Sequence, residues 1–171
     1  QAALKAIASE ETPNAVLSPE LLNALSLVLK HPTLDAAFKE LVLTLPSETY
    51  ISEQLTAVDP QRVHAVREAM RLQLATALHA DWVWAFDTHR NNGIYAPDPV
   101  SSGRRALSGL ALTMLCLHGV HAKDNSWPHR TLLHFTKASN MTDRFNALSA
   151  LVQSGHSLSA EALGSTTGPL F

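Results

Sequence analysis

The sequence predicts an all-α protein whose antiparallel helices stack as an armadillo-like or HEAT-like α-solenoid. Composition is the first observation: 27 leucines and 24 alanines stand against only 13 valines and isoleucines. Leucine and alanine favour helices, whereas β-branched residues favour strands. The second observation is that Pro, Gly and capping residues divide the chain into helical segments joined by short turns. No clean repeat period accompanies them, so the solenoid is inferred from helix lengths and turns.

Length, charge and cysteine usage narrow the functional classes. A chain of 171 residues is one domain or a piece of one. Charged residues make up 16% of the chain, below the roughly 25% of an average domain, which indicates that part of the surface is normally covered. A net charge of -2 without basic blocks argues against nucleic acid and anionic membranes as partners. A single cysteine excludes an internal disulfide and fits a reducing compartment.

The first third of the chain is predicted to form four short helical pieces. Residues 1–9 resemble the end of a helix whose beginning is missing, and we see no signal peptide or apolar run long enough to span a membrane. Three further helices are expected, ending near residue 31, before residue 45 and at residue 55. Each opens with a capping residue, namely Ser18 (followed by Pro19), Asp35 and Ser47.

One long helix is predicted from Asp59-Pro60 to Gly93, because about thirty residues there contain neither Pro nor Gly. Asp59 is the expected N-cap, and Gly93 is a suitable residue just past the end. Seven apolar side chains recur at steps of three or four and define one buried face: Val63, Val66, Met70, Leu74, Leu78, Trp82 and Phe86.

The second half is predicted to contain three more helices. A loop over 94–102 precedes a helix over 103–118, which is apolar on several sides and is ended by Gly119. Ser126 and Pro128 open the next helix, which runs to about residue 138. The boundaries predicted from this pattern are a helical domain over 1–155 and an irregular tail over 156–171.

The corner at 140–143 is predicted in more detail. Asn140 is expected to end one helix in the left-handed conformation, and Thr142 to cap the next. Met141 is expected to reach into the groove between neighbouring helices. In the helix that follows, Gly155 is the closing residue and four apolar residues are expected inside: Phe145, Leu148, Leu151 and Val152.

Nine histidines invite a search for a metal or catalytic site. The zinc-protease signature His-Glu-x-x-His is absent. The nearest approach to a metal site is His118-x-x-His121 with Cys116 nearby, but Cys116 and His118 are two apart and point to different helix faces. A buried inert thiol and ordinary residues at a helix end are the favoured interpretation.

Other candidate pairs are also poorly spaced. His79 with Asp81 and Asp87 with His89 are two residues apart on a helix, and His129 and His134 are five apart.

Two further clusters are considered as sites that recognise a partner. The first is Trp82, Trp84 and Phe86, for which core packing is the favoured interpretation. Trp84 is expected to point away from the face that Trp82 and Phe86 share. Arg104 and Arg105 begin a helix, where the helix dipole disfavours cations. We therefore expect them to pair with Asp98 or with carboxylates outside this chain. An anion-binding site is the other interpretation. We identify no catalytic, cofactor-binding or metal-ligating residue, and the residues alone describe a helical scaffold.

Three strings carry a family resemblance. They are LTLPSETYISEQLTAVDPQRVHAVREAM (43–70), YAPDPVSSGRRAL (95–107) and FTKASNMTDRFNALSALV (135–152). In order and spacing they resemble the C-terminal helical domain of the bacterial aminopeptidase N family, the gluzincin-type zinc aminopeptidases. The resemblance covers roughly residues 17–152. After Val152 the family continues through further helices, from which this sequence is expected to depart.

The resemblance implies a parent hydrolase of the cytoplasm that removes N-terminal residues from peptides with one zinc ion. Its zinc ligands and general base lie in an earlier domain, so this chain is expected to hold no zinc and to have no activity alone. The helical domain would cover the active site and restrict peptide access. The expected partners are the catalytic domain of the same parent chain and its peptide substrates, without nucleic acid or membrane.

Two alternatives stay open at this point. One is an independent α-solenoid adaptor that binds other proteins. The other is a small helical metal-binding or ligand-binding protein built on the region of His118 and His121.

Overall fold

The computed structural model describes residues 15–90 and 93–166, and within these ranges it contains helices and turns without a strand. The predicted all-α class is therefore confirmed, while the helix expected at residues 1–9 lies outside the described residues. The helices are α2 (Pro19–Lys30), α3 (Ala36–Leu43), α4 (Glu48–Glu53), α5 (Pro60–Ala77), α6 (His79–His89), α7 (Pro99–Ala122), α8 (Ser126–Lys137), α9 (Met141–Ser154) and α10 (Leu158–Thr166). No helix in the described ranges is long and apolar enough to cross a membrane.

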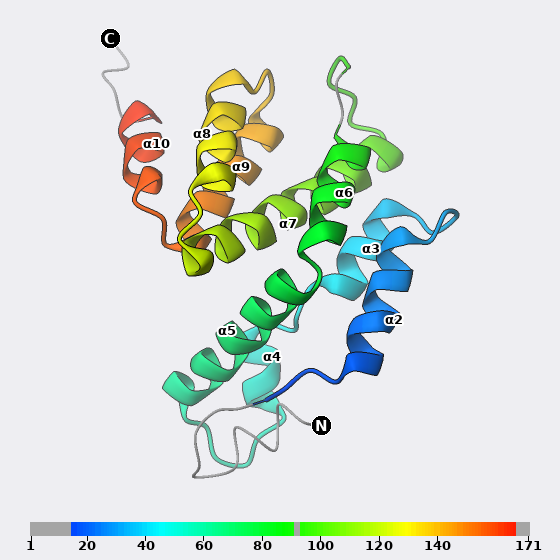
Figure 1. Cartoon of the computed structure of the whole chain (residues 1–171), viewed down its shortest axis with the longest axis vertical. Helices are drawn as coiled ribbons and strands as arrows, with labels where there is room; N and C mark the ends of the chain where they lie inside the picture. The colour runs from blue at the N-terminus through cyan, green and yellow to red at the C-terminus, as the bar shows by residue number, and fades with distance from the viewer. Residues whose placement is uncertain (1–14, 91–92, 167–171) are drawn as a thin grey trace.

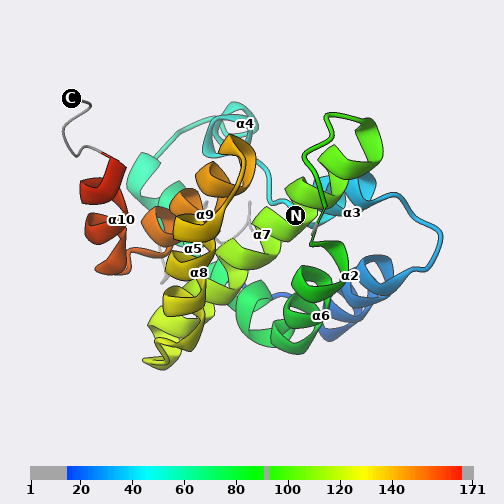
Figure 2. The ribbon, with the colours of Figure 1, turned by 90° about the horizontal axis from the view of Figure 1, so that it is seen from above.

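Helix α7 is the centre of the arrangement. It packs against α3, α5, α6, α8 and α9, and Figure 2 shows it running through the middle of the molecule. Helices α8, α9 and α10 lie on one side of it and α2 and α3 on the other (Figure 1). Consecutive helices also pack on each other, as α2 does on α3, α4 on α5, and α8 on α9.

The core is built from the inward faces of these helices. Its largest fully buried side chains are Trp82, Phe135, Leu29, Leu43, Leu74, Leu107, Leu112, Leu115 and Leu151. A second, smaller cluster forms where Ala15, Val63 and Val66 meet Ile51 and Leu55 beside α4. Burial of such side chains stabilises the fold by roughly 1.5–3 kcal/mol each.

Four predicted N-caps are confirmed. Each side-chain oxygen accepts a hydrogen bond from an amide in the first turn: Ser18 from Leu21 (3.2 Å), Asp35 from Ala37 (2.8 Å), Ser47 from Tyr50 (3.1 Å) and Asp59 from Gln61 (3.0 Å). Because these bonds span only two or three residues, the sequence alone locates the helix starts.

The single long helix predicted from residue 60 is wrong, because the chain breaks at Leu78 (φ −104°, ψ 23°) into α5 and α6. At the break the carbonyl oxygen of Leu74 accepts two hydrogen bonds, one from the Leu78 amide and one from the Trp82 indole N–H, each at 3.1 Å. The predicted apolar face is nevertheless buried, with Met70 only partly covered. Helix α6 ends at His89 with Arg90 as its C-cap, so Gly93 is not the residue that ends it.

Helix α7 is longer at both ends than predicted. It starts at Pro99, because the Asp98 carboxylate accepts from the Ser101 amide at 2.9 Å. It also continues through Gly119 to Ala122, and Lys123 is its C-cap, with a left-handed φ of 57°. Gly119 is needed for the turn that follows: a Cβ there would lie 2.6 Å from the carbonyl oxygen of Asp124.

The corner before α9 differs from its prediction. Asn140 is extended (φ −139°) and is itself the N-cap, accepting from the Asp143 amide at 2.9 Å, so Thr142 is not the cap. Met141 is 79% exposed and does not enter a groove between helices. Helix α9 begins at Met141, two residues before the predicted first helical position, and this side chain points outward.

The inner face of α9 is also partly mispredicted. Phe145 and Val152 are exposed rather than inside, Leu148 is partly buried, and the fully buried positions are Ala147, Ala150, Leu151 and Ser154. Small residues occupy the inner face because α9 lies close against α7. Gly155 closes the helix in the left-handed conformation (φ 70°), as predicted. The tail predicted to be irregular contains helix α10 over Leu158–Thr166.

Candidate functional site

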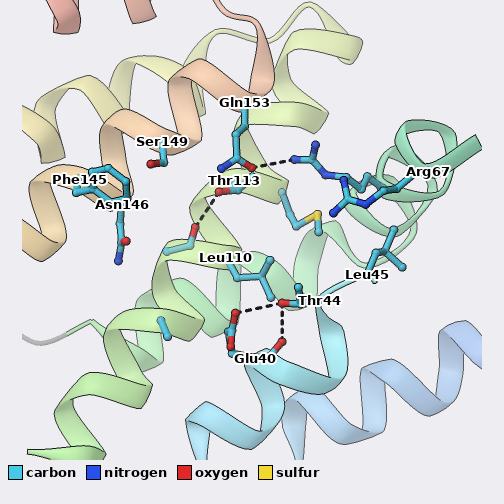
Figure 3. A pocket seen from close by; sticks show the side chains of 14 residues that line it. Glu40, Thr44, Leu45, Arg67, Leu110, Thr113, Phe145, Asn146, Ser149 and Gln153 are labelled. Atoms are coloured by element: carbon cyan, nitrogen blue, oxygen red, sulfur yellow. Dashed lines mark hydrogen bonds between the residues drawn. The ribbon is translucent and has the colours of Figure 1, made fainter. Parts of the chain in front are cut away.

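A hollow of about 370 Å³ lies where α3, α5 and α9 surround the middle of α7. Residues of α7 form its floor, including Gly109, Leu110, Thr113 and Met114. Three further parts of the chain form its walls. They are the end of α3 with the residues after it (Glu40, Thr44 and Leu45), α5 (Arg67 and Arg71) and α9 (Phe145, Asn146, Ser149 and Gln153). Figure 3 shows these side chains converging from the separate helices.

Two arginines share one carboxylate at the α5 wall. Both Glu68 oxygens accept from Arg71 Nη1, at 2.9 and 2.8 Å, and one of them lies 3.3 Å from Arg67 Nη1. Arg71 also donates to the Gln153 side chain of α9 at 3.4 Å, which ties the two walls together (Figure 3). Arg67 donates through Nε to the Pro46 carbonyl at 2.8 Å. Two cations against one anion leave this wall with one excess positive charge.

Another wall carries the carboxylate of Glu40, and the floor is in close contact with α9 at Gly109. Glu40 accepts from the Thr44 hydroxyl at 3.1 Å, at the end of α3. Asn146 lies so close to α7 that a Cβ on Gly109 would stand 2.8 Å from its side-chain nitrogen. Asn146 in turn donates to the Arg105 carbonyl at 3.2 Å, which fixes α9 to α7.

The hollow offers hydrogen-bonding groups and apolar surface without a catalytic set. Guanidinium groups face a carboxylate across a floor of Leu110 and Met114, and the lining carries no histidine, cysteine or tyrosine. An extended peptide has both donors and acceptors along its backbone, and such mixed walls match that pattern. The arrangement therefore suits binding rather than bond cleavage.

Cys116, His118 and His121, the nearest approach to a metal site in the sequence, lie apart in the structure. Cys116 is buried with its sulfur 3.1 Å from the Thr131 hydroxyl, and burial raises the pKa of this thiol to about 11. His118 turns instead toward α6, where its ring lies 4.3 Å from the ring of His79. Burial and then the neighbouring His79 lower the pKa of His118. His121 is exposed, and within the described ranges Cys116, His118 and His121 do not form a group of ligand atoms close enough to share an ion.

The other histidine–aspartate pairs have separate partners. Asp81 accepts from the Ser26 hydroxyl at 2.5 Å and pairs with Lys30 of α2. His89 Nδ1 lies 2.9 Å from the Ala85 carbonyl oxygen. Asp87 faces Arg130 at 3.9 Å, and His129 Nδ1 lies 2.7 Å from the carbonyl oxygen of Asn125. The aspartates thus join α6 to α2 and α8, the two histidines bond locally to carbonyls four residues earlier, and neither predicted histidine–aspartate pair is in contact.

The aromatic cluster is core, as interpreted. Trp82 and Phe86 are buried, and Trp84 is partly exposed with Lys39 5.8 Å from its ring centre.

The arginine pair at 104–105 does not contact Asp98, so that predicted pairing is wrong. Arg105 donates to the Ala96 carbonyl at 2.7 Å and stacks over Tyr95, while Arg104 donates to the Thr88 carbonyl at 2.8 Å. Asp98 is occupied as the cap of α7.

One group of potential metal ligands was not singled out from the sequence. In the described ranges, Glu48, His64 and Glu68 bring ligand atoms within 4.8 Å of one another, and His64 Nδ1 lies 2.8 Å from Glu48. However, Glu68 already accepts from Arg71, and the neighbouring guanidinium groups repel a cation. In this group the contact of His64 with Glu48 joins α5 to α4, and Glu68 pairs with Arg71 within α5.

Sequence reasoning missed the hollow, because its residues come from four separate stretches of the chain. A local signal existed only for Glu68 and Arg71, whose spacing of three places them on one helix face. Neither Glu40 nor Gln153 belongs to a motif that could have identified it.

Comparison with known proteins places the chain in a family. Residues 1–167 match a family model described as "Domain of unknown function (DUF3458_C) ARM repeats". The match continues past Val152, so the departure from the family expected there is wrong. The solenoid class is confirmed by the armadillo-repeat description together with the helical fold.

Three curated relatives bear the name aminopeptidase N. The chain is 35% identical over 133 residues to the protein of Haemophilus influenzae, which covers 78% of the chain and 14% of the relative. It is 32% identical over 143 residues to that of Caulobacter vibrioides (84% and 16%). It is 32% identical over 136 residues to that of Escherichia coli (80% and 15%). The chain thus spans only about one-sixth or less of these relatives.

The helical fold around α7 is therefore that of a known type of helical domain. The chain belongs to the DUF3458_C armadillo-repeat family and is homologous to the C-terminal helical domain of aminopeptidase N.

Proposed function

We propose that this chain is part of the helical domain that covers the active site of a zinc aminopeptidase and limits which peptides reach it. The observation that carries the proposal is its similarity, over 78–84% of its length, to three proteins named aminopeptidase N. The printed sequence holds no His-Glu-x-x-His. In this proposal catalysis belongs to another domain of the parent protein.

The residues of this chain do not fit the zinc site of such an enzyme. The ligand atoms of Glu48, His64 and Glu68 are contributed by two helices, and Glu68 is held by Arg71. That arrangement differs from two histidines one helical turn apart followed by a further carboxylate. We therefore assign no step of the reaction to a metal bound by this chain.

In this proposal the chain encloses the active site of the parent protein and contacts the peptide substrate. Covering an active site excludes bulk water and folded proteins, which strengthens the electrostatic interactions inside. The hollow beside α7 offers arginine, glutamate and amide side chains to the backbone of a long peptide. Its partners in this proposal are the catalytic domain of the same parent protein and the peptide substrate, in the cytoplasm.

The coding region around this chain provides the first test. An upstream His-Glu-x-x-His with a downstream glutamate supports the proposal. A complete reading frame without that motif overturns it and favours an independent adaptor. The isolated chain should hold no stoichiometric zinc and should not hydrolyse aminoacyl reporters, and hydrolysis by this chain alone would contradict the proposal.

A second test addresses peptide access in the full-length protein. Ser149→Trp fills the hollow and should raise KM for a long peptide while leaving KM for an aminoacyl reporter within about twofold. Ala160→Trp, on the exposed surface of α10, is the matched control and should change neither value. Equal KM values for wild type and Ser149→Trp on the long peptide would exclude the hollow from the substrate path.

A further inference from the structure

A second cavity, of about 410 Å³, lies between the end of α6 and the outer face of α8. It is lined by Phe86, Arg90, Arg130, Leu133, His134 and Lys137. Three of these six side chains are permanently cationic at neutral pH, and none is acidic. This concentration is notable in a chain with only 13 lysines and arginines and a net charge of -2.

The lining of α8 follows one helix face. Arg130, Leu133, His134 and Lys137 are spaced three, four and seven residues apart, so they point in the same direction. Arg130 and Lys137 are separated by two turns, about 10.5 Å along the axis. The face therefore presents a cation, then an apolar and neutral stretch, then a second cation.

The remaining groups complete a groove with an apolar floor. Phe86 is buried, and its ring lies 5.8 Å from the ring of His134 and 5.5 Å from the Arg90 guanidinium. Leu133 is 55% exposed at the edge of the groove. Burial lowers the pKa of His134, so its ring is neutral at pH 7 and presents one donor and one acceptor.

Two carboxylates, Asp87 and Asp143, lie near the groove and are outnumbered by its three cations. Asp87 approaches Arg130 only to 3.9 Å, with about half of each side chain exposed, and pairs of that kind contribute little. Arg130 also stacks on the Trp127 ring, 4.0 Å from its centre, which orients the guanidinium along α8. Asp143 lines the adjoining part of the surface together with Arg90 and His134, and it also accepts from the side-chain amide of Asn140 at 2.7 Å.

We propose that the groove between α6 and α8 binds a short acidic peptide segment in an extended conformation. In an extended strand the side chains of every second residue share a face, about 7 Å apart. A segment of the form Glu-x-Leu-x-Glu therefore directs a carboxylate, an apolar group and a second carboxylate toward the groove. This order matches Arg130, Leu133 and Lys137, with the long basic side chains absorbing the difference in spacing.

The proposal rests on the chemistry of the groove and does not depend on the proposed function. The test uses the full 171-residue chain and a labelled peptide, acetyl-Gly-Glu-Ser-Leu-Ser-Glu-Gly-amide, followed by fluorescence anisotropy. The matched peptide carries Gln in place of both Glu. We expect saturable binding of the Glu peptide that weakens as salt is raised, and at least about tenfold weaker binding of the Gln peptide.

Variants of the chain locate the site. Arg130→Gln and Lys137→Gln should each weaken binding by about two- to fivefold, and the double variant by more than either. Lys123→Asn removes a cation outside the groove, keeps a residue that tolerates its left-handed backbone, and should bind as the wild type does. Far-ultraviolet circular dichroism checks that each variant is folded.

Three results of the binding measurements would overturn the proposal. They are the absence of saturable binding, equal affinity for the Glu and Gln peptides, and equal weakening by Lys123→Asn and Lys137→Gln. Competition by citrate or inorganic phosphate separates a peptide site from a simple anion site. Displacement by either anion at the concentration at which unlabelled peptide displaces the probe would also contradict an acidic peptide as the ligand.

Discussion

Gly103 of α7 lies directly against Ala37 of α3, so closely that a Cβ on Gly103 would stand 2.8 Å from the backbone nitrogen and 3.0 Å from the Cβ of Ala37. The two residues are the point at which α3 crosses α7. Because the nearest atom belongs to backbone, a larger side chain cannot be accommodated by a rotamer change. This contact holds α3, one wall of the hollow, at its distance from α7.

The first prediction concerns this contact. Gly103→Ala should lower the free energy of unfolding by about 1–2 kcal/mol, since overpacking outweighs the roughly 1 kcal/mol that alanine gains in a helix. Gly164→Ala is the control, because no heavy atom lies within 4 Å of its Cβ position. Urea denaturation should show an unchanged or higher midpoint for that control. A stabilised Gly103→Ala variant would show that α3 can move away freely.

The second prediction concerns the break between α5 and α6. Trp82→Phe removes the indole N–H that donates to Leu74 and leaves a small void, so it should cost about 1–3 kcal/mol. Trp84→Phe changes a partly exposed side chain and should cost less than about 0.5 kcal/mol. Chemical denaturation followed by circular dichroism compares the two. Equal losses would mean that neither the hydrogen bond to Leu74 nor the packing of the Trp82 ring contributes at the break.

The third prediction concerns the reactivity of Cys116. Burial raises the pKa of this thiol to about 11, so little thiolate exists at pH 8 and reagents have poor access. Ellman's reagent should therefore react slowly with the native chain at pH 8 and rapidly after unfolding. A Cys116→Ala variant gives the baseline. Rapid reaction of the native chain would require an opening between α7 and α8.

The fourth prediction concerns the pH dependence of stability. Burial and His79 lower the pKa of His118 below its ordinary value of 6.5, so the unfolded chain binds more protons than the folded chain as pH falls. The stability contribution is present above pH 6.5 and is lost as pH decreases through the folded-state pKa. The urea midpoint should fall between pH 7.5 and pH 5.

The variant His118→Gln isolates this contribution. It removes the titrating group while keeping a polar side chain of moderate size, so the fall in the urea midpoint on acidification should become shallower. Identical slopes for the variant and the wild type would assign the pH dependence to His89 and His134, whose pKa values burial also lowers.

The sequence by itself determined the helical class and most helix starts. Ser18, Asp35, Ser47 and Asp59 each cap a helix through a hydrogen bond to an amide two or three residues away. Such bonds are local, so the residues that make them can be read in order along the chain. The buried face of α5 and α6 was also predictable, since it depends only on helical spacing.

The tertiary structure alone decided where helices break and which apolar residues stay outside. The chain bends at Leu78 without a Pro or Gly, Gly119 continues a helix that it was expected to end, and Phe145 is exposed while Ala147 is buried. Each outcome depends on a neighbouring helix or turn. Gly119 faces the Asp124 carbonyl, and the small residues of α9 face α7.

The two cavities were also decided by the tertiary structure alone. Glu40, Arg71 and Gln153 meet around one hollow, and Phe86 and Lys137 around the other, although they are far apart in the sequence. No local pattern connects them, because their proximity follows from the packing of α3, α5, α6, α8 and α9 around α7. Helix capping is a short-range interaction, whereas burial and the shape of a site depend on contacts between distant segments.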